Sequence, residues 1–261
     1  MNKFPFVEKV RASSIVDKGD FIENMCCGKS VLDLGCVCHD EAFYNSDDWL
    51  HARIKGVAKD LLGVDYLKSD VEKLQQKGFN VVCADVTRKI NVEKQFDVIV
   101  AGDIVEHLVN FEGFFENLER LLAPGGKILL STPNPFYAGE FHYVSFKRSY
   151  LINPEHTCWI DPMAMHQLVS RFGFKIEELY FLDGSWSLGS LISESSNDHY
   201  DILKGHWTKN GFIARVRRRI LKELFNLFYL LYRIMTFQNT KLVKYSDYLV
   251  VLKKADLIPD R

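Results

Sequence analysis

The feature that most constrains the fold of this chain is an alternation of short apolar runs with helical patterns through its first half. The first run, residues 30–34 (SVLDL), is followed by Gly35, as expected of a buried parallel strand. Residues 111–122 carry apolar side chains at i, i+3, i+4 and i+7, which predicts an amphipathic helix. Strands that alternate with helices predict βαβ units and a mostly parallel sheet. The further predicted strands are residues 58–65, 78–85, 95–102 and 126–132.

The second half of the chain predicts one more helix and two more strands. Asp161 and Pro162 are typical of the start of a helix, and Gly173 ends the helical pattern that follows them. Apolar runs then predict strands over residues 175–182 and 247–254. These elements complete a doubly wound α/β sheet of seven strands.

The segment between the last two predicted strands is too long for a simple connection. We therefore expect residues 183–245 to form a helical insertion or lid. The remaining residues, 1–182 and 246–255, are expected to form one α/β domain. A single domain with an appendage is also what a length of 261 residues favours.

The composition agrees with a globular protein. Hydrophobic residues make up 47% of the chain and charged residues 26%, which excludes collagen-like, mucin-like and wholly disordered proteins. The six cysteines contain no Cys-x-x-Cys pair, so we expect reduced thiols and no structural zinc. The N-terminal residues contain no apolar signal segment. These features predict a cytoplasmic protein.

The net charge of −1 conceals an uneven distribution of charge along the chain. Residues 201–261 hold 13 Lys and Arg against 5 Asp and Glu, whereas the rest of the chain is acidic. An acidic body disfavours a nucleic-acid partner. Residues 212–236 combine a basic cluster with apolar residues, and they predict an amphipathic helix. Such a helix would bind an anionic membrane surface, at the inner face of the membrane, or a second copy of the chain; the sequence leaves both possibilities open.

Acidic residues lie in or at the ends of three neighbouring predicted strands. Asp33 lies in the first strand, and Asp65 and Asp85 end the second and the third. In open parallel sheets, ligands bind beyond the carboxyl ends of the strands, which is where these residues gather. One carboxylate can hold both hydroxyl groups of a ribose, so the pattern favours a nucleoside or nucleotide.

These residues resemble the motifs of the class I S-adenosylmethionine-dependent methyltransferases. In that family an Asp-x-Gly segment after the first strand contacts the methionine end of the cofactor, which implies this role for Asp33 and Gly35. An acidic residue that ends the second strand binds the ribose, and an acidic residue after the third strand meets the adenine. The resemblance implies these roles for Asp65 and Asp85, S-adenosyl-L-methionine as cofactor, and a Rossmann-like methyltransferase fold.

The resemblance covers residues 25–182 and 246–254. The segment that ends at Gly102 looks like the fourth motif of the family, which implies a cofactor contact there. The glycine-rich turn differs from the family pattern, because the second and third glycines of Gly-x-Gly-x-Gly are replaced by Val37 and His39. This replacement concerns the pose of the cofactor at the turn and not the identity of the cofactor.

A cluster of ionisable residues follows the fourth predicted strand. Asp103, Glu106 and His107 are spaced i, i+3 and i+4, so on a helix they would share one face. His156 lies downstream in Asn-Pro-Glu-His and is expected to close over the same pocket. These four residues suit a divalent ion such as Mg²⁺, Mn²⁺ or Zn²⁺. Alternatively, Glu106, His107 and His156 act as catalytic acid and base without a metal, or merely stabilise the local structure.

A similar Glu-x-x-Glu-His pattern is associated with a divalent metal in the ubiquinone-biosynthesis and small-RNA 2′-O-methyltransferases. In this chain Asp103 replaces the first Glu. A similarly placed arginine in the ubiquinone-biosynthesis enzymes implies that Arg11 reaches the methionine carboxylate.

The motifs favour an oxygen atom as the methyl acceptor. The Asn/Asp-Pro-Pro-Tyr/Phe signature of many nucleic-acid amino-group methyltransferases is missing after the fourth predicted strand. The segments 102–108, 132–135 and 154–159 look most like bacterial enzymes that methylate surface sugars or glycolipids. We therefore predict an O-methyltransferase that acts on such a small molecule. Two alternatives stay open: a quinone or lipid-phenol O-methyltransferase, and a methyltransferase-like module that binds without catalysis.

Overall fold

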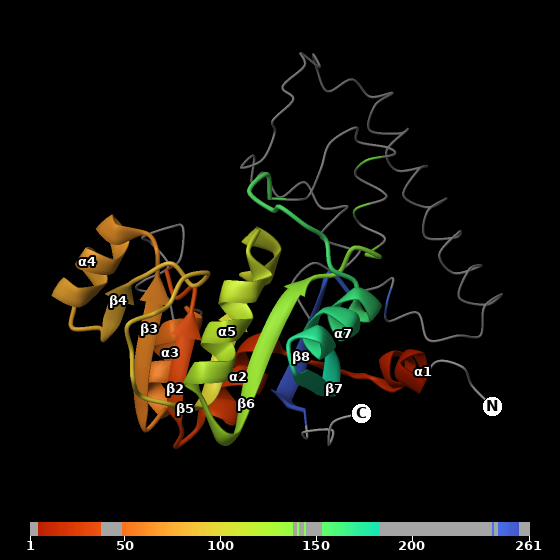
Figure 1. Cartoon of the computed structure of the whole chain (residues 1–261), viewed down its shortest axis with the longest axis horizontal. Coiled ribbons are helices and arrows are strands. Elements are labelled where there is room, and N and C mark those ends of the chain that lie inside the picture. The colour runs from red at the N-terminus through yellow and green to blue at the C-terminus, as the bar shows by residue number, and fades with distance from the viewer. Residues whose placement is uncertain are drawn as a thin grey trace, which may run out of the picture.

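The computed structural model describes residues 5–37, 49–137, 140, 144, 153–182, 242 and 245–255, and it has an α/β fold (Figure 1). The strands are β1 (Ser14–Val16), β2 (Ser30–Leu34), β3 (Asp60–Asp65), β4 (Val81–Cys83), β5 (Phe96–Gly102), β6 (Leu122–Pro133), β7 (Phe174–Leu182) and β8 (Asp247–Lys254). The helices are α1 (Pro5–Ala12), α2 (Lys18–Cys26), α3 (Leu50–Val57), α4 (Lys68–Gln76), the 3₁₀ turn η2 (Val105–His107), α5 (Phe111–Leu121) and α7 (Pro162–Arg171).

Strand β2 lies inside the sheet, whose order is β1-β7-β8-β6-β5-β2-β3-β4. From β2 the chain runs outward through β3 to β4 and then returns to β5 on the other side of β2. Ligands of open α/β sheets bind beyond the carboxyl ends of the strands at such a reversal. Strand β8 is antiparallel to β6 and β7, and the other strand pairs of the sheet are parallel.

Helices cover both faces of the sheet (Figure 1). Side chains of successive strand residues point to opposite faces, so Leu32 belongs to the apolar cluster that includes residues of α5 and α7, and Val31 belongs to the one that includes residues of α2 and α3. All five residues of β2 are buried. This double burial explains why the strand has a continuous apolar pattern rather than an alternating one.

The predicted doubly wound, mostly parallel sheet is confirmed, but within the described residues it has eight strands rather than seven. The additional strand is β1, which pairs with β7 at one edge. Its three residues include the exposed Ser14 and Ile15. A short strand with exposed residues has no apolar run, and therefore the sequence gives no signal for it.

Two predictions fall on residues outside the described part of the chain. The amphipathic helix of residues 212–236 lies there entirely, and the insertion of residues 183–245 is described only at Leu242 and Tyr245. The division into a domain and an insertion, and the membrane or dimer contact, stay predictions. Within the described residues, no helix is both long and apolar enough to cross a membrane.

Asn117 on α5 fixes the segment that follows β4. Its amide group donates hydrogen bonds to the carbonyl oxygens of Val86 and Arg88, at 2.9 and 2.6 Å. Its Oδ1 accepts a hydrogen bond from the main-chain N–H of Ile90 at 3.1 Å. Asn117, Val86 and Ile90 are buried, so the main-chain groups of Val86 and Ile90 depend on the Asn117 side chain for their hydrogen bonds. Asn117 therefore holds the segment that begins at Asp85, at the predicted adenine edge.

We predict that Asn117→Ala lowers the free energy of unfolding by about 3 kcal/mol, because buried main-chain donors and acceptors lose their partners. Urea denaturation measures this change. Glu116→Ala is the matched control on the same helix, since Glu116 is exposed, and it should change the free energy by less than about 0.5 kcal/mol. Equal stability of the two variants would contradict the role given to Asn117.

Candidate functional site

The turn after β2 occupies the centre of the predicted cofactor site. Gly35 has a φ of +76°, which favours glycine. A Cβ at this position would lie 3.1 Å from Cδ1 of Ile104, so the turn also lacks space for a larger residue. The carbonyl oxygen of Cys36 accepts a hydrogen bond from the indole of Trp49 at 3.1 Å. The turn is thus held by packing and by a buried hydrogen bond, although the later glycines of the family pattern are missing.

Asp33 lies in the protein interior, against α3. Its Oδ2 lies 2.7 Å from Nδ1 of His51, and both side chains are buried. Gly63 on β3 makes room for this pair, because a Cβ there would lie 2.7 Å from the His51 ring. His51 has no recognisable motif in the sequence. The predicted contact between Asp33 and the methionine end stays a prediction.

Asp65 and Asp85 follow neighbouring strands and lie at the same edge of the sheet. The carboxylate of Asp65 accepts hydrogen bonds from the main-chain N–H groups of Val37 and Leu67, at 3.0 and 3.1 Å. Burial raises the pKa of Asp65, and these N–H groups oppose the shift. Asp85 is exposed, and its carboxylate accepts hydrogen bonds from the N–H and the hydroxyl of Thr87. Asp65 is therefore oriented by the turn that it faces.

Lys18, for which the sequence gives no motif, lies at the carboxyl end of β5. It forms an ion pair with Asp103, and its Nζ is 3.8 Å from the position that a Cβ on Gly102 would take. Burial opposes the charge of Lys18, but the Asp103 carboxylate outweighs it and raises the pKa of Lys18. Arg11 instead pairs with Glu8 on α1, and α1 contacts α7. The structure thus brings Lys18, and not Arg11, to Gly102.

The helix predicted to align Asp103, Glu106 and His107 is only the single 3₁₀ turn η2. Asp103 precedes this turn with a φ of +50°, and a left-handed residue interrupts the helical repeat. Its carboxylate accepts a hydrogen bond from the hydroxyl of Ser131 at 2.7 Å. Burial would raise the pKa of Asp103, but Lys18 outweighs this effect and lowers it. The prediction of one shared helical face is therefore wrong.

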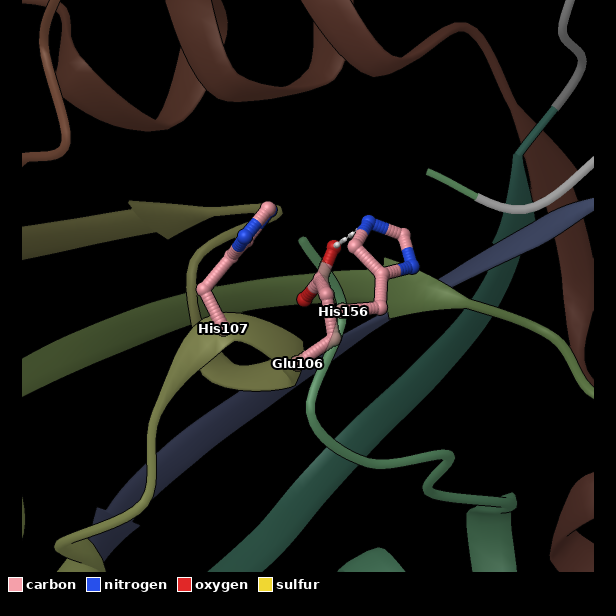
Figure 2. A group of neighbouring side chains, drawn as sticks. All are labelled: Glu106, His107 and His156. Atoms are coloured by element: carbon pink, nitrogen blue, oxygen red, sulfur yellow. Dashed lines mark ion pairs between the residues drawn. The ribbon is translucent and has the colours of Figure 1, made fainter. Parts of the chain in front are cut away.

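Glu106, His107 and His156 do come together, from η2 and from the segment before α7 (Figure 2). Each offers one ligand atom, and these atoms all lie within 4.8 Å of one another. Oε1 of Glu106 is 4.0 Å from Nε2 of His156, and the two histidine rings meet edge to face with centroids 4.7 Å apart. Thr157 fixes this arrangement by donating hydrogen bonds from its N–H and its hydroxyl to the Glu106 carbonyl.

Glu106 is a buried acid with one unsatisfied oxygen. The residue is 1% exposed, and its Oε2 accepts a hydrogen bond from Thr132 at 3.0 Å. Its Oε1 has no hydrogen-bond partner among the described residues. Burial and the nearby Asp103 raise the pKa of Glu106 to about 8. Burial and the neighbouring His107 lower the pKa of His156, so its ring is neutral at pH 7. Such a site is suited to accept a proton or a cation.

A pocket of about 240 Å³ is lined by Glu106, His156 and residues from the end of β6 and the start of β8. Asp247 lies in this pocket and pairs in register with Pro133 across the two strands. Burial, together with the Asp103 carboxylate, raises the pKa of Asp247 to about 6. The sequence places Asp247 at the start of a strand but gives no signal that it faces a pocket.

The residues fit the implied S-adenosyl-L-methionine at two points. Gly35 has a left-handed conformation and no side chain, so the main chain of the turn can lie close to a ligand. The oriented carboxylate of Asp65 suits a ribose diol. The donor set of the Glu106 cluster, one carboxylate and two imidazoles, also fits a divalent ion, and the unpartnered Oε1 supplies a ligand atom.

Comparison with known proteins gives related sequences. A family model described as a methyltransferase domain matches residues 19–179. A "Probable S-adenosylmethionine-dependent methyltransferase" of Mycolicibacterium smegmatis is 27% identical over 161 residues, which are 60% of this chain and 56% of the relative. Two ubiquinone biosynthesis O-methyltransferases of Coxiella burnetii are 26% and 31% identical over 160 residues, 58% of this chain and 66% of each relative. The matches thus span less than two thirds of these relatives.

Solved structures show the same fold at low sequence identity. An S-adenosylmethionine-dependent methyltransferase from Archaeoglobus fulgidus is 16% identical with a TM-score of 0.50, and the match covers 97% of this chain and 100% of that one. A structure from Bacillus halodurans C-125 is 14% identical with a TM-score of 0.53 and coverages of 92% and 98%. These likenesses confirm the Rossmann-like fold. The family model for a methyltransferase domain matches more than half of this chain. The chain therefore belongs to the methyltransferase domain family.

Proposed function

We propose that this chain is an S-adenosyl-L-methionine-dependent O-methyltransferase that acts on a hydroxyl group of a small molecule. The observation that carries the proposal is that Glu106 and His156 lie in the wall of a pocket beside the predicted cofactor site. Ile104 links the two, because it contacts the turn at Gly35 and lies two residues before Glu106. A methyl donor and an acceptor would thus meet at one edge of the sheet.

The cofactor supplies a methyl group on a sulfonium, and the protein residues must hold both reactants and remove one proton. Asp65 is proposed to hold the ribose, Asp85 the adenine edge and Lys18 the methionine carboxylate. The neutral ring of His156 would take the proton from the acceptor hydroxyl. Oε1 of Glu106 lies 4.0 Å from Nε2 of His156, and the positive charge that the ring gains would favour ionisation of Glu106.

A divalent ion is the alternative way of removing the proton. Glu106, His107 and His156 would hold the ion, which would lower the pKa of the acceptor hydroxyl. The unpartnered Oε1 of Glu106 supports this version, because a buried acid with a raised pKa ionises readily beside a cation. The two versions use the same residues and differ in whether activity needs a metal.

Two classes of acceptor are candidates. A sugar or glycolipid of surface polysaccharide biosynthesis is favoured by the segments at 102–108, 132–135 and 154–159. A phenol such as a quinone precursor is favoured by the names of the Coxiella relatives. Both classes present a hydroxyl group, and methyl-transfer assays with both kinds of acceptor distinguish them. A non-catalytic module would bind the cofactor without methylating either class.

We predict that Asp65→Ala weakens binding of S-adenosyl-L-homocysteine by about 2 kcal/mol, because the ribose loses a charged hydrogen-bonding partner. Isothermal titration calorimetry measures this loss. Asp60→Asn is the control, since Asp60 lies at the opposite end of β3 and pairs with Lys94. An unchanged dissociation constant for Asp65→Ala would remove Asp65 from the cofactor site.

A second prediction separates Lys18 from Arg11 as the partner of the methionine carboxylate. Lys18→Met should raise the dissociation constant of S-adenosyl-L-homocysteine at least tenfold, a loss of about 1.5 kcal/mol or more. Arg11→Met should change it less than twofold, because Arg11 pairs with Glu8 on α1. Lys18→Arg should restore part of the affinity. The reverse order of effects would return the role to Arg11.

The third prediction concerns the proton. Glu106→Gln and His156→Gln should each reduce turnover at least a hundredfold, since both leave the pocket without its acid–base pair. In the metal version a chelator abolishes wild-type turnover, and Mg²⁺, Mn²⁺ or Zn²⁺ restores it. In the histidine version turnover persists in the chelator. If both variants keep near-normal turnover, the cluster is structural and neither version holds.

A further inference from the structure

Several polar groups of the acceptor pocket are already used within the protein. Asn134 donates hydrogen bonds from its amide to the carbonyl oxygens of Leu242 and Tyr245, at 2.6 and 2.8 Å. Its Oδ1 accepts from the main-chain N–H of Phe136 at 3.1 Å. Thr132 donates its hydroxyl to Glu106, as described above. A ligand therefore gains little from these two side chains.

Two of the three acidic side chains that line the pocket, those of Glu106 and Asp247, have further capacity for hydrogen bonds. Oε1 of the buried Glu106 has no hydrogen-bond partner among the described residues. Asp247 receives a hydrogen bond from the hydroxyl of Ser246 on Oδ2, and an ionised carboxylate can accept several more. Neither Lys nor Arg occurs among the described residues that line the pocket. The matching ligand brings hydrogen-bond donors and carries no negative charge into the pocket.

Glu106 and Asp247 lie on two sides of the end of β6. Glu106 is bonded to Thr132, whereas Asp247 pairs in register with the next residue, Pro133. Successive residues of a strand face opposite sides of a sheet, so the two carboxylates approach the pocket from different sides. A single hydroxyl at the Glu106–His156 pair therefore leaves Asp247 available for a second one.

The wall of the pocket also offers a flat apolar surface. Trp159 lines the pocket, and 48% of the residue is exposed. An exposed indole in a pocket suits the face of a ring, either aromatic or that of a sugar. The segment that carries it is fixed, because Tyr248 donates its hydroxyl to the carbonyl of Ile160 at 2.7 Å.

We infer that Asp247 determines acceptor specificity by binding a second hydroxyl group, so that the pocket selects an uncharged ring with two hydroxyl groups. The shared chemistry is a ring diol, which a sugar and a catechol both provide. The inference rests on the proposed function, because the first hydroxyl is the one that Glu106 and His156 are proposed to deprotonate.

The test compares ligands that differ by one hydroxyl group. Catechol is titrated against phenol, and methyl glucoside against its 3-deoxy analogue, with S-adenosyl-L-homocysteine present. The wild type should bind the member with the additional hydroxyl group at least tenfold more tightly in one of the two pairs. In Asp247→Leu this ratio should fall below threefold, because the second hydroxyl loses its acceptor. Asp247→Asn, which keeps one oxygen, should show an intermediate ratio. The pair that shows the preference tells a catechol site from a sugar site.

Asp60→Asn is the control variant and should keep the wild-type ratio, since Asp60 lies outside the pocket. Urea denaturation establishes that the Asp247 variants are folded. A wild type without preference in either pair, or a preference that survives both substitutions, overturns the inference. Methyl transfer is measured separately: preferential binding without any methylated product contradicts the proposed function and leaves the role of Asp247 standing.

Discussion

The burial of β2 on both faces is the constraint on which the rest of the site depends. All five of its residues are buried, and β3 and β5 flank it. At the carboxyl end of β2 the chain turns through Gly35, which has a left-handed conformation. Because β5 ends beside the same turn, the residues that follow it are held against the predicted cofactor site. The predicted cofactor site and the proposed acceptor pocket are thus neighbours because of the strand order of the sheet.

The pocket lined by Glu106 is built around an acid that is costly to bury. A carboxyl group with a pKa of about 8 and one unpaired oxygen gives no stability that an apolar residue would not give better. Segments distant in sequence nevertheless converge on it, since Thr132 bonds its carboxylate and Thr157 bonds its main chain. Strongly shifted acids in pockets are typical of functional sites, which supports a chemical role for Glu106.

The sequence predicts the sheet well because buried parallel strands are apolar throughout, and it brings Asp65 and Asp85 to one edge because parallel strands end together. It predicts less of the site. The meeting of Glu106 with His156 follows from motif likeness, whereas the helical spacing used to place Asp103 fails at a left-handed residue. Lys18 and Asp247 belong to no motif, because an ion pair and a pocket wall depend on packing between distant segments. Such residues can be assigned to the site only from the folded structure.

Asn134, directly after β6, is hydrogen-bonded to the residues that precede β8. Its hydrogen bonds hold the carbonyls of Leu242 and Tyr245, and its main-chain N–H donates to Ser246 at 2.6 Å. The chain therefore enters β8 from a fixed anchor at the end of β6. We expect these hydrogen bonds to keep Asp247 at the start of its strand even if residues 183–241 are replaced by a segment of different length. This wall of the pocket is thus tied to the end of β6 by hydrogen bonds of a single side chain and its main chain.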